Sequence, residues 1–91
     1  MLYLSTKTLL SSIVQQLETT EGEWDDHIES GKECLYEMYQ MLTPGVASSI
    51  DHLAVRKIGR AIPHVKSMLG SIRRGDRITA IEQGKAAIAQ L

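Results

Sequence analysis

Apolar residues recur along this chain at steps of three and four, the spacing that returns side chains to one face of a helix. The longest such series lies in residues 22–43 and consists of Trp24, Ile28, Gly31, Leu35, Met38 and Leu42. It predicts one long amphipathic helix with an apolar seam similar to that of a coiled coil. Pro44 and Gly45 follow directly, and we expect the helix to end there because proline cannot continue the backbone hydrogen bonds.

The segments on either side repeat the helical period. Residues 9–17 carry a stripe of Leu9, Leu10, Ile13, Val14 and Leu17. Thr19, Thr20 and Gly22 then close that helix, so a short connection predicts an antiparallel hairpin with residues 22–43. After Gly75, Asp76 is expected to cap a last helix, with four apolar residues on one face: Ile78, Ile81, Ile88 and Leu91.

Residues 50–72 hold a further apolar stripe, interrupted by Pro63. Two interpretations remain open. A single helix can kink at Pro63, with Gly59 easing the clash at the carbonyl four residues earlier, or a separate helix can start at the proline. The single kinked helix is favoured, because no loop-forming residues separate the two halves.

These elements predict an all-α protein: a small up-down bundle of four or five helices, forming a single domain over residues 1–91. Alternating strand patterns are absent from the sequence. The 43% hydrophobic content is ordinary for a globular chain, and the scarcity of aromatic residues leaves aliphatic side chains to fill the core. Gly31 and Gly84 fall on apolar helix faces, which indicates tight internal packing, a groove for another helix, or a bundle that a second chain completes.

Charge divides the chain into two halves. Residues 1–45 hold eight acidic against two basic residues, a net charge of −6, and residues 46–91 hold eight basic against three acidic residues, a net charge of +5. Glu29, Glu33 and Glu37 lie four residues apart beside the seam, a spacing at which like charges repel by about 0.2–0.5 kcal/mol per pair. An acidic stripe of this kind favours a basic partner surface, in the same chain or on another molecule.

The sequence therefore predicts a small non-enzymatic protein-binding module: an adaptor, a chaperone, or a regulator or inhibitor. Binding is expected to bury one apolar set against a partner helix, namely Trp24, Ile28, Leu35, Met38 and Leu42. Glu29, Glu33 and Glu37 are then expected to fix the orientation through opposite charge. The partner is another protein or a second copy of the chain, with a homodimer favoured.

The alternative is a nucleic-acid-associated protein that uses the basic segment 56–77. Its candidate contacts are Arg56, Lys57, Arg60, Lys66, Arg73, Arg74 and Arg77. Against this alternative, the sequence pI is about 6.3, and the segment has neither a clear helix-turn-helix pattern nor aromatic residues for stacking. Pairing of these cations with the acidic helix is the favoured interpretation.

Candidate chemistry is sparse. Cys34 is the single cysteine, and His27, His52 and His64 lack the spacing of a zinc or di-iron site. A cysteine on the apolar side of a helix is typical of a buried, unreactive thiol. We therefore expect no enzyme activity, metal, cofactor or small-molecule substrate. No signal-peptide pattern or run of about 18 apolar residues occurs, so we expect a cytoplasmic protein without a membrane partner.

One short motif resembles a known family. Gly22, Glu23, Trp24 and Asp25 follow an amphipathic first helix, and this junction is similar to that between the first two helices of small helical-bundle flagellar export chaperones. The resemblance covers four residues and a pattern, and the basic third segment and alanine-rich last helix do not extend it. It implies a bundle that holds a helix of another protein, and it transfers no binding residue.

Overall fold

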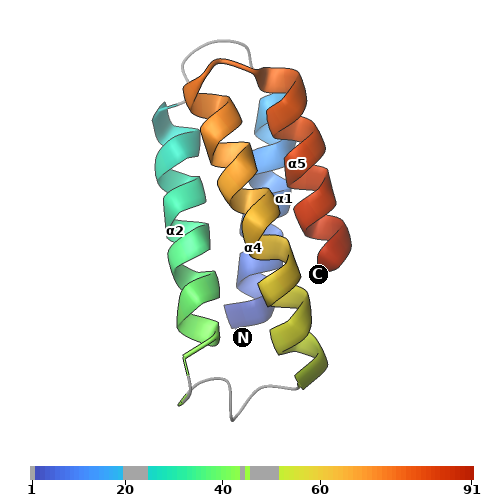
Figure 1. Ribbon diagram of the computed structural model, residues 1–91. Coiled ribbons are helices and arrows are strands. Elements are labelled where there is room, and N and C mark those ends of the chain that lie inside the picture. The colour runs from blue at the N-terminus through green and yellow to red at the C-terminus, as the bar shows by residue number, and fades with distance from the viewer. Residues whose placement is uncertain (1, 20–24, 44, 46–51) are drawn as a thin grey trace.

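The computed structural model describes residues 2–19, 25–43, 45 and 52–91, and these form four helices and no strand (Figure 1). The helices are α1 (Leu2–Thr19), α2 (Asp25–Met41), α4 (His52–Arg73) and α5 (Arg77–Gln90). They run alternately up and down in an elongated bundle of 41 × 19 × 18 Å. The predicted all-α class and up-down arrangement are confirmed.

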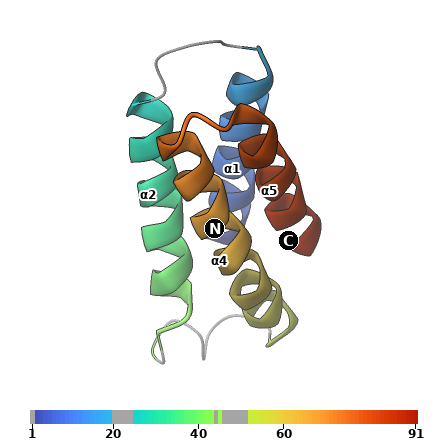
Figure 2. The same ribbon diagram turned by 45° about the horizontal axis from the view of Figure 1, so that its top comes forward.

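The four helices occupy the corners of a square in cross-section. α1 packs between α2 and α5, and α4 packs between the same two neighbours, so α1 and α4 lie diagonally opposite (Figures 1 and 2). Each helix therefore faces the centre with a stripe that touches two neighbours. The largest fully buried apolar side chains at that centre are Leu10, Ile13, Leu17, Met38, Met41, Ile58, Val65 and Met68.

The buried stripe of α2 is rotated by about one residue from the predicted seam. Cys34, Met38 and Met41 are fully buried, whereas Leu35 and Leu42 are only half-buried at the side of the core. The reason is that α2 packs against both α1 and α4, so its core stripe points between them. A seam facing a single partner helix would have buried Leu35 and Leu42 instead.

Pro63 lies inside α4, which continues unbroken from His52 to Arg73. The favoured interpretation of a single helix is confirmed, and a separate helix starting at the proline is excluded. Pro63 is exposed, and Gly59, one turn earlier, has open space where a side chain would begin. The lost backbone hydrogen bond thus lies on the solvent side, while Ile62 and Val65 remain buried in the core on either side of the proline.

The turn between α4 and α5 has the Schellman geometry. Gly75 adopts a positive φ of 74°, its N–H donates to the Ile72 carbonyl at 3.0 Å, and the Asp76 N–H donates to the Ser71 carbonyl at 2.8 Å. Asp76 then caps α5 by accepting from the Thr79 backbone N–H at 3.1 Å. Hydrogen bonding to Thr79, first by its side chain and then by its backbone N–H, lowers the pKa of the Asp76 carboxyl. The predicted helix end at Gly75 and cap at Asp76 are confirmed.

Of the predicted core face of α5, Leu91 is buried and Ile81 and Ile88 pack half-buried against the core, but the prediction is wrong for Ile78. Ile78 is 71% exposed, while Ala80, Gly84 and Ala87 form the buried stripe together with Leu91. A side chain begun at Gly84 would overlap Val14 of α1 and come within 3.1 Å of the Met68 sulfur of α4. Small residues therefore face the core because α5 approaches both neighbours closely.

Gly31 on α2 has the same role against α4, where Leu69 occupies the space that a side chain at position 31 would need. Of the uses predicted for Gly31 and Gly84, the structure shows tight packing within the chain.

Candidate protein-binding surface

The solvent-facing side of α2 combines exposed aromatic and acidic side chains. We define the outer surface of α2 as Glu29, Lys32, Glu33, Tyr36, Tyr39 and Gln40, all exposed. Tyr36 is 65% exposed and Tyr39 is 43% exposed. Tyrosine is enriched in protein interfaces, because its ring offers a large contact area and its hydroxyl a hydrogen bond at low entropic cost.

The two tyrosines differ in what holds them. The Lys66 ammonium of α4 lies 5.3 Å from the centroid of the Tyr39 ring, within range of a cation–π interaction. Tyr39 is thus positioned over the neighbouring helix. Tyr36 makes no such contact with the described part of the chain, and its ring projects from α2 toward solvent.

The structure disperses the predicted apolar binding residues. Met38 is fully buried in the chain's own core, and Ile28, Leu35 and Leu42 pack half-buried against that core. Trp24 lies outside the described residues. The described members of the seam are therefore covered mainly by α1 and α4 of the same chain, and they do not form an open apolar strip.

The predicted glutamates have two different environments. Glu29 and Glu33 are exposed on the outer surface of α2. Glu37 is half-buried, and its carboxylate accepts a hydrogen bond from the Thr6 hydroxyl of α1 at 3.3 Å. The structure thus brings Glu29 and Glu33 together with the two tyrosines and directs Glu37 toward α1.

The tyrosines were missed by the sequence-based prediction. They occupy positions on the polar face of the helix, where a search for apolar periodicity does not look. A signal was present, because two of the chain's three tyrosines fall three residues apart on that polar face.

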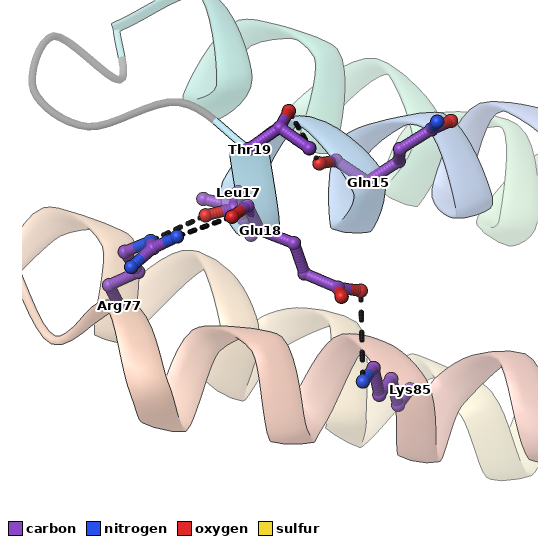
Figure 3. Close-up of polar contacts among 6 residues, drawn as sticks. All are labelled: Gln15, Leu17, Glu18, Thr19, Arg77 and Lys85. Carbon is purple, nitrogen blue, oxygen red and sulfur yellow. Dashed lines mark hydrogen bonds and ion pairs between the residues drawn. The ribbon is translucent and has the colours of Figure 1, made fainter.

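Among the described residues, one ion pair joins the acidic half of the chain to the basic half, and it lies between α1 and α5, away from the glutamates of α2. Glu29 contacts Lys32 within α2 at 3.4 Å, and Glu18 of α1 contacts Lys85 of α5 at 3.7 Å (Figure 3). In the ranges 25–43 and 52–91, no ion pair joins the glutamates of α2 to the cations of α4. Exposed pairs of this kind stabilise a fold by at most about 1 kcal/mol.

The basic candidates also separate into groups. Arg77 donates from its guanidinium to the backbone carbonyls of Leu17 at 2.6 Å and Glu18 at 2.5 Å, at the end of α1 (Figure 3). It caps a neighbouring helix, and that contact occupies the guanidinium. Lys66 is placed over Tyr39.

Arg74 donates to the Ser71 hydroxyl at 3.2 Å. Lys57 is half-buried, and Arg56, Arg60 and Arg73 are exposed on α4.

Two potentially reactive side chains are buried. Cys34 is fully buried with its thiol 3.9 Å from the Thr6 carbonyl oxygen, and burial, with a contribution from the Glu37 charge, raises the pKa of the thiol to about 12. His27 is 8% exposed, and its Nε2 has no hydrogen-bond partner among the described residues. Among the described residues no three histidine, cysteine or acidic side chains gather as metal ligands would.

The described helices include none with the length and apolar content needed to cross a bilayer. Comparison of the chain with protein-family models, with curated proteins and with solved structures gave no match.

Proposed function

We propose that this protein is a small protein-binding module whose contact surface is the outer surface of α2. The observation that supports this most directly is the exposure of Tyr36, at 65%, beside Glu29 and Glu33 on one helix face. Buried aromatic side chains contribute a large share of the binding energy in protein interfaces. The ring of Tyr36, which the bundle leaves exposed to solvent, is therefore the candidate side chain for binding a partner.

The charges beside Tyr36 favour a basic partner. Glu29 and Glu33 lie one turn apart on the same side of α2, and Lys32 is the only lysine or arginine of that helix. Acidic groups around an aromatic anchor select a positively charged surface and speed its association more than they raise the affinity. The proposed partner surface therefore combines an apolar pocket for Tyr36 with arginine or lysine side chains.

The test is capture of protein from an extract of the native host by the immobilised chain. Tyr36→Ala/Tyr39→Ala is expected to abolish capture, because truncating a tyrosine that anchors an interface weakens binding by about 2 kcal/mol or more. Ile78→Ala is the matched control, since Ile78 is also a large exposed apolar side chain but lies on α5. Capture that survives in the tyrosine variant, or is lost equally in the control, would contradict the proposal.

A second candidate function is nucleic-acid binding, favoured by the exposed arginines of α4 that pair with no acidic side chain in the described part of the chain. Retention on a DNA column should then weaken steeply with salt, because binding releases counterions from the DNA. Each phosphate contact contributes about −0.9 to the slope of log binding constant against log salt concentration. Arg73→Ala/Arg74→Ala should reduce that slope by about two. Weak retention that this variant leaves unchanged would exclude the second function.

A further inference from the structure

Two charged stripes run along the outside of the bundle. The acidic stripe is Glu29 and Glu33 on α2, and the basic stripe is Arg56 and Arg60 on α4. All four side chains are exposed, and in each stripe the two residues lie four apart, one helical turn.

Contacts of the adjoining turns fix the side of the bundle on which each stripe lies. One turn beyond Glu33, Glu37 accepts a hydrogen bond from Thr6 of α1, so the acidic stripe follows the α1 side of α2. One turn beyond Arg60, Nδ1 of His64 hydrogen-bonds Oε1 of Gln83 of α5 at 2.9 Å, so the basic stripe follows the α5 side of α4.

The two stripes therefore open on opposite sides of the molecule. The pair α1–α2 forms one side of the square bundle and the pair α4–α5 forms the opposite side (Figure 2). The body of the bundle lies between them, which explains why no ion pair joins them within the described chain.

We propose that the basic stripe of one copy docks on the acidic stripe of a second copy, so that the chain associates with itself head to tail. The inference rests on the proposed function, because it uses the outer surface of α2 and names a partner for it. The partner surface that α2 favours, basic with an apolar neighbour, is present on α4 of this same chain.

The spacing of the two surfaces supports this pairing. α2 and α4 run antiparallel within one chain (Figure 1), so two copies stacked in the same orientation place α2 of one antiparallel to α4 of the other. Along α2, Glu33 and Tyr36 follow Glu29 at steps of four and three residues. Read backwards along α4, Arg56 and Leu53 follow Arg60 at the same steps. The antiparallel helices then give the pairs Glu29–Arg60, Glu33–Arg56 and Tyr36–Leu53. Tyr36 and Leu53 are two of the large apolar side chains exposed on the described surface, at 65% and 55%.

Because the two stripes are different surfaces on opposite sides, the contact does not close after two copies. A heterologous contact of this kind gives chains of molecules that lengthen with concentration. Its ion pairs lie at the rim of a small interface, so the association is weak and sensitive to salt.

The first measurement is the average mass by sedimentation equilibrium, over about 10 µM to about 1 mM protein, the range of weak specific complexes. We expect the mass to rise from 10.1 kDa past that of a dimer at low salt. It should fall back toward the monomer in about 0.5 M NaCl, where the Debye length is about 4 Å. A mass that stays at the monomer up to about 1 mM at low salt would overturn the proposal.

The second measurement uses charge reversal on each stripe. Glu29→Arg/Glu33→Arg makes both surfaces basic, and Arg56→Glu/Arg60→Glu makes both acidic. Each variant alone should associate at least about tenfold more weakly, because like charges then face each other. An equimolar mixture of the two variants should associate again, since basic and acidic surfaces are once more available. Unchanged association of either variant, or no recovery in the mixture, would assign the contact to other surfaces and refute this one.

These outcomes separate the inference from the proposed function. If the chain stays monomeric but captures a host protein through Tyr36 and Tyr39, the self-association is refuted and the proposed function stands. If the chain self-associates through the stripes but captures host protein equally well without the two tyrosines, the inference holds and the proposed function fails.

Discussion

The guanidinium of Arg77 donates a hydrogen bond from Nε to the backbone carbonyl of Leu17, 2.6 Å away, and so joins the start of α5 to the end of α1. The last carbonyls of a helix have no partner within it, and a cation there also complements the helix dipole. The same guanidinium contacts the Glu18 carbonyl (Figure 3). A residue that the sequence suggests for phosphate binding is thus used to cap a neighbouring helix.

Removal of this cap should destabilise the bundle. Arg77→Gln is expected to lower the free energy of unfolding by about 1–3 kcal/mol, the range for hydrogen bonds to a charged donor. Arg73→Gln is the control, an exposed arginine without a described hydrogen-bond partner, and it should change stability by less than about 0.5 kcal/mol. Urea denaturation followed by circular dichroism measures both. Equal effects of the two substitutions would refute the capping role.

The close approach of α5 to its neighbours gives a second prediction. Gly84→Ala should destabilise the protein by about 1–3 kcal/mol, because the added methyl overlaps Val14 and crowds the Met68 sulfur. This cost should exceed the gain of about 1 kcal/mol that alanine brings to a helix interior.

Gly59→Ala is the matched control for Gly84→Ala. Position 59 has open space, so only the helix-propensity gain should remain there. Opposite signs of the two changes in thermal unfolding are the expected result. Two stabilising substitutions would show that α5 does not pack as closely as described.

The buried thiol gives a prediction about alkaline pH. The pKa of Cys34 is raised to about 12 in the folded chain by burial, from an ordinary value of 9.0. The folded state therefore keeps its thiol proton where the unfolded state loses it, and stability should fall as the pH rises from about 9 toward 12. The slope contributed by this one group is at most about 1.4 kcal/mol per pH unit.

Cys34→Ala isolates this contribution from the lysines and tyrosines that titrate in the same range. The variant should be less stable than the wild type at neutral pH, because it loses buried volume. The difference should shrink between pH 9 and pH 11. A difference that stays constant over this interval would show that the thiol titrates normally in the folded chain.

Helical periodicity predicted the elements because burial repeats with the helix turn. The all-α bundle, the helix through Pro63 and the cap at Asp76 follow from local spacing and from turn residues. Periodicity predicted less accurately which side of each helix faces the core. The core stripe of α2 uses Cys34 and Met41 where the pattern favoured Leu35 and Leu42, because two neighbouring helices share that stripe.

Side-chain size was the second source of error. Ile78 is apolar and yet exposed, while Gly84 is buried because only a residue without a side chain permits the approach of Val14. That choice depends on the distance between helices, which a single sequence does not contain.

The candidate surface was predicted only in part. Glu29 and Glu33 were identified from their charge and spacing, and both are exposed. The exposure of Tyr36 depends on the rotation of α2, and the separation of the acidic and basic stripes depends on the order of the helices around the square. Both are tertiary properties, so composition alone suggested internal pairing of the two halves.

The central claim is that the outer surface of α2 binds protein, and photo-crosslinking in the native host tests it most directly. p-Benzoylphenylalanine is placed at Tyr36, and as control at Ile78 on α5, and adducts are identified by mass spectrometry. We expect discrete protein adducts at position 36, including a second copy of the chain, and none at position 78. Absence of adducts at position 36, or the same adducts at both positions, would contradict it.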